Sequence, residues 1–392
     1  MRKIGVGTIS ISDAAKRNVM EVLDTARLSY GPFLKRLEKD FSAIHDTKFG
    51  IVSNSGTSAL HVALQALKEI HGWNDDDEVL VPAVTFVATS NIILHNRMKP
   101  VFVDVEREYY GIDHKKIEER ITSKTRAIIP AHLFGMPCDM ESIAKIAKKH
   151  NLKIIEDSCE TMYARYKGKM VGSLGDIGCF STYVAHLLVT GVGGINTTNN
   201  PEYAIKIRSL INHGRDSIYM SIDDAEGKTG KELQEVIEGR FRFISIGHSF
   251  RVTELEGALG VAQLQILPDI INARRKNAAY LIEHLKPFED HIQLPKIRPD
   301  AEHSFMMLPI VMKNETKQKI VEYLENKGIE TREMLPLINQ PAYKKLFNIN
   351  ENDYPVAKWI NESGFYIGCH QSLKEDDLKH IIDVFSEYFN KG

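Results

Sequence analysis

Runs of small and polar residues follow several hydrophobic segments of the chain, at positions where α/β proteins usually carry out chemistry. In open α/β sheets, ligands bind beyond the carboxyl ends of the strands. The first run, SNSGTS at residues 53–58, opens an amphipathic segment. Small residues and hydroxyls at a helix N-terminus can hold a phosphate, because free backbone N–H groups and the helix dipole point at the anion. Ordinary N-capping is the alternative.

Three further runs carry side chains suited to a planar, nitrogen-containing ligand. Phe86 could stack on a ring, although an aromatic residue there also fits the core. Asp157 lies in the acidic run EDSCET at 156–161, and a carboxylate facing a pyridine nitrogen keeps that nitrogen protonated. A solvated strand end or helix cap is the alternative. His186 follows FSTYVA, and a lone histidine is more often structural. The GVGG run at 191–194 lacks the full glycine fingerprint of a phosphate loop.

The elements that must position these side chains alternate between β-rich runs and amphipathic helical segments. This alternation indicates an α/β fold with a largely parallel sheet and helices on both faces. Continuous apolar runs are typical of such buried strands. Two helices precede the sheet, over 12–28 and over 32–44. The predicted strands of the sheet are 49–54, 78–83, 100–105, 127–134, 153–158, 176–182 and 193–199.

A change of pattern in the last third of the chain predicts two domains. From about residue 300 the order of strands and helices is that of a small α+β unit. We place a large α/β domain at 1–255 and a small C-terminal α+β domain, with its linking helix, at 256–392. The helical stretch at 252–288 is predicted to break near Pro268. The polar residues 213–246 predict a surface loop or insertion.

The composition excludes several classes of protein. Lys and Arg number 50, Asp and Glu 52, and the net charge is −2. This balance argues against a nucleic-acid binder and against a polybasic membrane-surface protein. No apolar run has the length of a membrane span, and the N-terminus has no secretory signal pattern. The four cysteines form no CxxC pair or close cluster, so we expect no metal site and a cytoplasmic location.

Taken in order, the motifs SGTSAL, VPAVTFVAT, PVFVDV, AIIPAHLFG, IIEDS, GDIGCFS and GVGG resemble the DegT/DnrJ/EryC1/StrS family of pyridoxal-phosphate enzymes. The resemblance continues through NHGRD at 212–216 and IGHSFRVTELEGALGVAQLQIL at 246–267. It implies the type I (aspartate aminotransferase) fold, with a mostly parallel seven-stranded sheet, and a homodimer with shared active sites. It also implies cofactor-binding roles for Gly56, Thr57 and Ser181 at the phosphate, Phe86 at the ring and Asp157 at the pyridine nitrogen.

Two positions depart from the family pattern in ways that concern the cofactor. Aminotransferases of this family have a Schiff-base lysine where this chain has His186, and no lysine lies between Lys169 and Lys206. Imidazole forms no stable adduct with the cofactor aldehyde, but it serves as a general base near neutral pH. Ser249 stands where the family often has an asparagine that reaches the partner subunit's cofactor phosphate.

The change from lysine to histidine, together with EDSCET, resembles one subgroup, the nucleotide-sugar 3-dehydratases. The resemblance implies C3 dehydration of a nucleotide-linked 4-keto-6-deoxyhexose for 3,6-dideoxysugars of surface polysaccharides. Pyridoxamine 5′-phosphate would be the working form of the cofactor and L-glutamate its amino donor, with a separate reductase in one branch. His186 would be the catalytic residue, first as base and then as acid. Candidate substrate-binding residues are Tyr30, His213, Arg215 and His370. Completing the dimer is the alternative for His213 and Arg215, and an ordinary structural role is the alternative for all four.

Two other functions remain open from the sequence. The first is a sugar-nucleotide aminotransferase that uses another lysine. The second belongs to another class, a catalytically silent regulator that binds the cofactor or a sugar nucleotide. The gap between Lys169 and Lys206 argues against the first, and the intact Thr57, Asp157 and Ser181 argue against the second.

Overall fold

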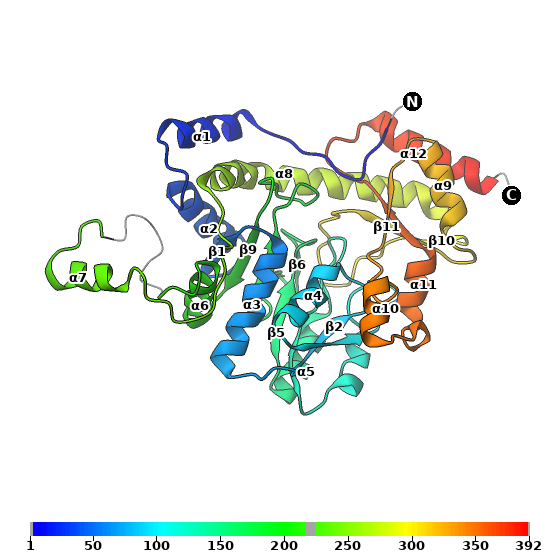
Figure 1. The fold of residues 1–392 in the computed structure, drawn as a ribbon. Helices are drawn as coiled ribbons and strands as arrows, with labels where there is room; N and C mark the ends of the chain where they lie inside the picture. Colours follow the sequence, from blue (N-terminus) through cyan, green and yellow to red (C-terminus); the bar gives the residue numbers. More distant parts are fainter. Residues whose placement is uncertain (1–2, 217–224, 391–392) are drawn as a thin grey trace.

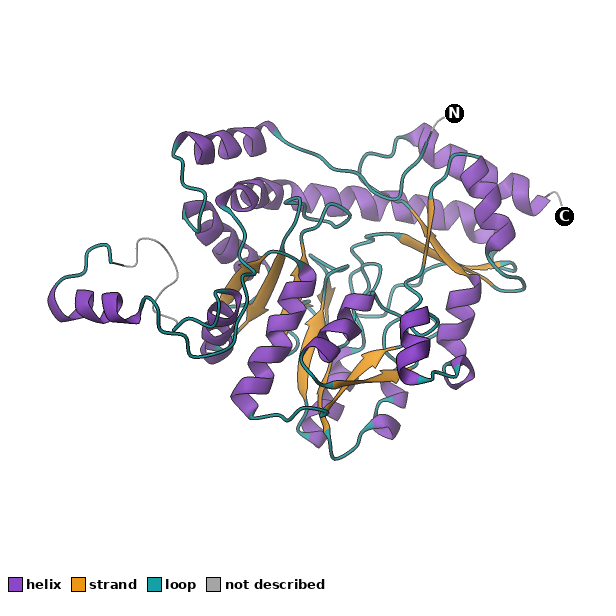
Figure 2. Cartoon of the chain, in the orientation of Figure 1, coloured by secondary structure: helices purple, strands orange, loops and turns teal. Residues whose placement is uncertain are grey.

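The structure is a computed structural model of the 392-residue chain, and it describes residues 3–216 and 225–390. A seven-stranded sheet lies at the centre of its larger part (Figures 1 and 2). The spatial order is β1-β9-β8-β5-β4-β2-β3. Every pairing from β8 to β3 is parallel, whereas β9 is antiparallel to both of its neighbours. Each strand overlaps its predicted run: β1 (Phe49–Ser53), β2 (Glu78–Pro82), β3 (Lys99–Val103), β4 (Thr125–Ile128), β5 (Lys153–Asp157), β8 (Ile177–Ser181) and β9 (Gly194–Thr198).

Helices precede the sheet and connect its strands. Ser12 caps the first helix, because its side chain accepts the N–H of Ala15, and Pro32 occupies the first turn of the second. The helices and short elements of this larger part are α1 (Asp13–Asp24), α2 (Pro32–Ile44), α3 (Gly56–His71), α4 (Val87–His95), η1 (His114–Lys116), η2 (Glu118–Arg120), α5 (Met140–His150), β6 (Arg165–Tyr166), β7 (Lys169–Met170) and α6 (Pro201–Ile211).

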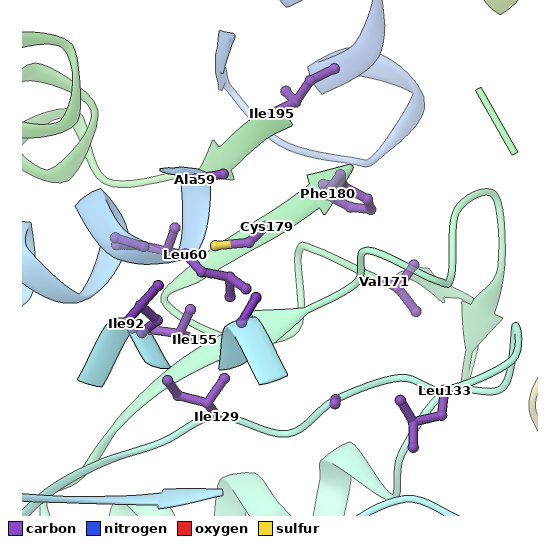
Figure 3. Close-up of a cluster of buried hydrophobic side chains, with 14 of the residues drawn as sticks. Ala59, Leu60, Ile92, Ile129, Leu133, Ile155, Val171, Cys179, Phe180 and Ile195 are labelled. Carbon is purple, nitrogen blue, oxygen red and sulfur yellow. The ribbon is translucent and has the colours of Figure 1, made fainter. Parts of the chain in front are cut away.

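Successive residues of the parallel strands face different layers of the fold. Ile155 of β5 belongs to the large core formed with α3 and α4, and Figure 3 shows it beside Leu60 of α3 and Ile92 of α4. Ile154, one residue earlier, lies in a separate cluster with Ile143 of α5. Side chains alternate between the two faces of a strand. Burial on both faces explains why these strands read as continuous apolar runs in the sequence.

A long helix, α8 (Glu254–Leu285), connects the larger part to a smaller one (Figure 1). The break predicted near Pro268 is wrong, because the helix runs through this residue. Leu264 and Ile271 are buried in the same core, so both halves of the helix are held in place although the proline removes a backbone N–H donor. The capping box between Thr253 and Glu256 fixes where the helix begins.

The smaller part contains a four-stranded antiparallel sheet in the order β10-β11-β13-β12. Ile4, near the N-terminus, bridges Ile329 and packs in the same apolar cluster as Phe365 and Phe385. The N-terminal residues therefore pack with the C-terminal third of the chain. The elements of this part are η3 (Lys286–Phe288), β10 (Ile292–Gln293), β11 (Leu308–Met312), α9 (Gln318–Asn326), β12 (Thr331–Glu333), α10 (Pro341–Phe347), η4 (Glu351–Asp353), α11 (Pro355–Ser363), β13 (Gly364–Ile367) and α12 (Glu375–Asn390).

Within the predicted insertion at 213–246, the segment around the helix α7 (Gly230–Gly239) extends away from the body of the molecule (Figure 1). The sequence analysis did not predict this helix, and residues 217–224 lie outside the described residues. We call residues 225–246 the arm. Its exposed apolar side chains include Phe241 and Ile246, which are 80% and 89% exposed. Among the described helices, none is both long enough and apolar enough to cross a membrane.

Candidate active site

A cavity of about 370 Å³ lies where the carboxyl ends of β1, β2, β5 and β8 meet. Side chains from the smaller part, among them Met307 and Tyr366, complete its wall. The structure brings together six of the predicted site residues on this wall: Gly56, Thr57, Phe86, Asp157, Ser181 and His186.

One end of the cavity is the N-terminus of α3. Ser55 caps this helix, with its Oγ accepting the N–H of Ser58 at 3.0 Å. The first-turn N–H groups of a helix have no acceptor within the helix, so they are available to an anion. A Cβ atom at Gly56 would lie 2.8 Å from both Sγ of Cys159 and Cβ of Ser181. Glycine therefore allows the helix end to approach Ser181 closely.

Asp157 supplies a carboxylate whose position is fixed by two donors. Thr89 of α4 donates its hydroxyl to Oδ2 at 2.7 Å, and the backbone N–H of Cys159 donates to Oδ1 at 3.2 Å. The sequence analysis missed Thr89, whose signal was a hydroxyl three residues after Phe86 in a helix that starts at the cavity. Asp157 is 7% exposed, so it is almost enclosed while still lining the cavity.

Glu156, the neighbouring carboxylate, is fully buried and is bound to the protein itself. It accepts three backbone N–H groups, from Gly172, Leu174 and Gly175, and it lies 3.1 Å from Nε2 of His132. Nδ1 of His132 accepts the N–H of Cys138, so the ring proton is on Nε2 and points at Glu156. Of these two adjacent carboxylates, Glu156 therefore stabilises the fold, whereas Asp157 is available to a ligand in the cavity.

His186 lies in the loop between β8 and β9, and its side chain lines the cavity. Its backbone N–H donates to the carbonyl of Tyr183, and its Nδ1 is buried without a hydrogen-bond partner. Burial lowers the pKa of His186 to about 4, so the ring is neutral near pH 7 and can accept a proton.

None of the described residues that line the cavity is a lysine. Of the two lysines that bracket His186 in the sequence, Lys206 is bound through Nζ to Glu69 and Ser245, and Lys169 is exposed on β7. The structure therefore offers an imidazole, and no lysine amine, at this point of the cavity.

Glu160 is a lining residue that the sequence analysis did not single out. Its Oε2 accepts the backbone N–H of Phe134 at 2.9 Å. Burial raises the pKa of Glu160 to about 7, and the charge of Asp157 adds to this rise, while the Phe134 N–H opposes it. The signal in the sequence was a third carboxylate in EDSCET, but only the fold shows that it faces the cavity.

Five other predicted residues lie outside this cavity. Tyr30 donates its hydroxyl to Glu38 at 2.6 Å and lines a smaller cavity of about 100 Å³. His370 is buried, with its carbonyl accepting the side-chain amide of Asn277. The other three residues lie at the base of the arm. Ser249 accepts a hydrogen bond from Arg251, and His213 is exposed. The guanidinium of Arg215 lies over the rings of Phe241 and Phe243.

The lining of the cavity fits a phosphorylated pyridine cofactor. The open cradle at Gly56, beside Ser181, suits the phosphate, and Asp157 suits a protonated ring nitrogen. Phe86, which is 58% exposed at the mouth, has a ring face available for stacking. The buried, unpartnered Nδ1 of His186 is a polar atom that the protein alone does not satisfy.

Known proteins of one cofactor-dependent family match this chain over nearly its full length. The model of the DegT/DnrJ/EryC1/StrS aminotransferase family matches residues 10–386. A GDP-perosamine synthase of Caulobacter vibrioides is 31% identical over 390 residues, covering 98% of each chain. A GDP-4-keto-6-deoxy-D-mannose 3-dehydratase of Yersinia pseudotuberculosis is 29% identical, covering 99% of this chain and 100% of the other. The E. coli GDP-4-keto-6-deoxy-D-mannose-3-dehydratase with bound hydrated PLP has a TM-score of 0.89 at 26% identity, covering 98% and 99%.

Proposed function

The chain belongs to the DegT/DnrJ/EryC1/StrS aminotransferase family, and we propose a reaction for it on this basis. It has the fold of PLP-dependent aminotransferases, with pyridoxal 5′-phosphate as cofactor. In our proposal, the protein removes the C3 hydroxyl of a nucleotide-linked 4-keto-6-deoxyhexose. The product would serve the synthesis of 3,6-dideoxysugars for surface polysaccharides. One observation carries the proposal: His186 lines a cavity whose described lining contains no lysine.

In this proposal the cofactor is held by the residues at one end of the cavity. Gly56, Thr57 and Ser181 bind the phosphate, because they combine the helix N-terminus with a hydroxyl. Phe86 covers one face of the ring. Asp157 keeps the ring nitrogen protonated, and the hydrogen bond from Thr89 holds this carboxylate in place.

The reaction depends on a proton transfer by His186. Pyridoxamine phosphate, when bound, supplies an amine that condenses with the sugar ketone and a ring that accepts an electron pair. The neutral imidazole of His186 takes the proton from C4′ of the cofactor, and the C3 hydroxyl leaves the sugar. L-Glutamate would restore the amine after each turnover.

The proposal includes a homodimer in which each cavity is completed by the second copy. Cofactor and sugar nucleotide together carry three phosphates, yet none of the described residues lining the cavity is Lys or Arg. The exposed arm and its base combine aromatic side chains with cations such as Arg215 and Arg242. Ser249 lies at the same base, where it pairs with Asn212, and it does not line the cavity of its own chain. In a dimer, these groups from the second copy would meet the phosphates.

A sugar-nucleotide aminotransferase is the second candidate, favoured by the 31% identity with a GDP-perosamine synthase. The two functions differ in their products. The test is to incubate the protein with pyridoxal phosphate, L-glutamate and a 4-keto-6-deoxy sugar nucleotide. We expect ammonia, 2-oxoglutarate and a 3-deoxy sugar nucleotide. An amino sugar would support the aminotransferase, and turnover of neither kind would favour a silent binding protein.

A further inference from the structure

The wall of the cavity carries a further titratable side chain, Glu160, in addition to Asp157 and His186. Glu160 follows Asp157 by three residues, in the segment that leaves the carboxyl end of β5. Oε2 of Glu160 accepts one backbone N–H, and among the described residues no Lys or Arg forms an ion pair with this carboxylate. A carboxyl group that lines a cavity without a cationic partner is suited to hold a proton.

Glu160 and His186 lie on segments that leave the sheet side by side. β5 and β8 are parallel neighbours, with Asp157 opposite Cys179 in register. The segments after these two strands carry Glu160 and His186, and both residues line the same cavity. One ligand in this cavity can therefore meet both groups.

The surroundings of Glu160 and His186 shift the pKa values of these two residues in opposite directions. Burial raises the pKa of Glu160 to about 7 and lowers the pKa of His186 to about 4. Near pH 7 a large fraction of the Glu160 carboxyl groups, about half, therefore keeps its proton, whereas the imidazole of His186 is neutral. Two titratable groups with pKa values displaced in opposite directions form an acid and base pair.

We propose that Glu160 is a further catalytic residue, the acid that protonates the departing C3 hydroxyl while His186 acts as the base. This inference rests on the proposed dehydration. The C3–O bond breaks with its electron pair on oxygen, the proton of Glu160 joins that oxygen, and water leaves. Carbon 3 regains an electron pair from the C–H bond that His186 deprotonates. Glu160 loses one proton and His186 gains one, so the charge of the pair is unchanged.

Using one residue as the base and another as the acid has a chemical advantage over using a single histidine for both roles. A single imidazole must first accept a proton and then deliver it, so it serves the two bonds in sequence. A carboxyl and an imidazole on neighbouring segments serve both bonds in one step. This assignment replaces the expectation that His186 itself returns the proton to the leaving group.

The first test measures protonation in the absence of turnover. The infrared difference spectrum between wild type and Glu160→Gln, recorded without cofactor, reports the carboxyl band of this residue. We expect a protonated carboxyl at pH 6 that disappears by about pH 8. The groups that face Glu160 are Asp157, Cys159 and Tyr366. Burial raises the pKa values of Cys159 and Tyr366 further above their usual alkaline range, so neither titrates between pH 6 and pH 8. A carboxylate already ionised at pH 6 would overturn the proposal.

The second test uses the loaded enzyme and separates this inference from the proposed function. Wild type is expected to dehydrate the sugar and to lose kcat above about pH 7, where the acid is ionised. Glu160→Gln should lower kcat about 100-fold and abolish that alkaline fall. Glu160→Asp, which keeps a carboxyl group, should retain part of the activity and the pH dependence, and it serves if the glutamine variant does not fold.

The possible outcomes of the second test are distinct. If wild type forms no 3-deoxy sugar, the proposed dehydration fails. If wild type forms this product and Glu160→Gln matches it in rate and pH profile, only the role of Glu160 fails. A Glu160→Gln variant that binds cofactor more weakly but keeps the wild-type pH profile would identify Glu160 as a binding residue and also overturn the proposal.

Discussion

The hydroxyl of Thr89 donates to Oδ2 of Asp157 at 2.7 Å and thereby joins α4 to the end of β5. Thr85 lies 2.8 Å from the same hydroxyl, so a short chain of hydroxyl groups supports one carboxylate oxygen. This arrangement fixes the carboxylate before any ligand binds. Preorganised polar groups of this kind are what a cofactor site needs, because a fixed carboxylate does not have to reorient when the ring arrives.

The first prediction concerns this hydrogen bond. Thr89→Val keeps the shape of the side chain but removes its donor to Asp157. A hydrogen bond to a charged group is worth about 1.5–3 kcal/mol, so the dissociation constant of pyridoxal phosphate should rise about tenfold or more. Absorbance titration of the apoprotein measures this constant. Thr89→Ser keeps a hydroxyl and is the control, and equal constants for all three proteins would show that the hydrogen bond does not serve the cofactor.

The second prediction concerns the close approach at Gly56. In Gly56→Ala, the added Cβ would lie 2.8 Å from Sγ of Cys159 and from Cβ of Ser181, so α3 must move away. Overpacking of this kind costs about 1–3 kcal/mol. We expect a lower melting temperature and weaker cofactor binding. Gly7→Ala is the matched control, because a Cβ there has no atom within 4 Å. A Gly56→Ala protein with unchanged melting temperature and affinity would exclude a tight cradle.

The third prediction concerns stability and pH at Glu160. Its folded pKa of about 7 lies above the usual 4.5, so the folded state holds this proton more tightly than the unfolded state. The stabilisation is complete below about pH 4.5 and is lost as the pH rises through about 7. The difference in melting temperature between Glu160→Gln and wild type should therefore increase from pH 4 to pH 8, in favour of the variant.

Calorimetric scans across that pH range provide the measurement. Glu21→Gln, on an exposed position of α1, is the control and should show no such trend. A constant difference between Glu160→Gln and wild type at all pH values would mean that burial does not perturb this carboxyl group.

The fourth prediction concerns the arm. If its apolar side chains contact a second copy, Phe241→Glu should shift the protein from dimer to monomer and reduce turnover. Sedimentation velocity measures the assembly. Leu346→Glu in α10, where the side chain is 64% exposed, is the matched control and should remain dimeric. A wild-type protein that is monomeric and active would contradict the shared site.

The strands of the large sheet were predictable from the sequence because burial on both faces makes them continuous apolar runs. The residues at the strand ends were predictable for a different reason, because the carboxyl ends of neighbouring parallel strands meet at one edge of the sheet. Phe86, Asp157 and His186 therefore line one cavity in the structure. The helix through Pro268 was not predictable, because the tertiary packing of Leu264 and Ile271 decides it.

Other features depend on contacts between distant segments, which local patterns do not encode. Thr89 reaches Asp157 only because α4 follows a strand two positions away in the sheet. The raised pKa of Glu160 requires a buried position beside Asp157. Tyr30 and His370 were candidate substrate-binding residues in the sequence. The fold places Tyr30 against Glu38 beside a smaller cavity and buries His370, and neither lines the larger cavity.

The most direct test of the central claim compares His186→Asn with wild type in a single product assay. Both proteins are loaded with pyridoxamine phosphate, and each is mixed with a 4-keto-6-deoxy sugar nucleotide and followed by NMR. Asparagine retains polarity but cannot serve as a base near neutral pH. We predict that wild type forms the 3-deoxy sugar, and that the variant binds cofactor with similar affinity and forms none. Full dehydration by His186→Asn, or an amino sugar from wild type, would contradict the account.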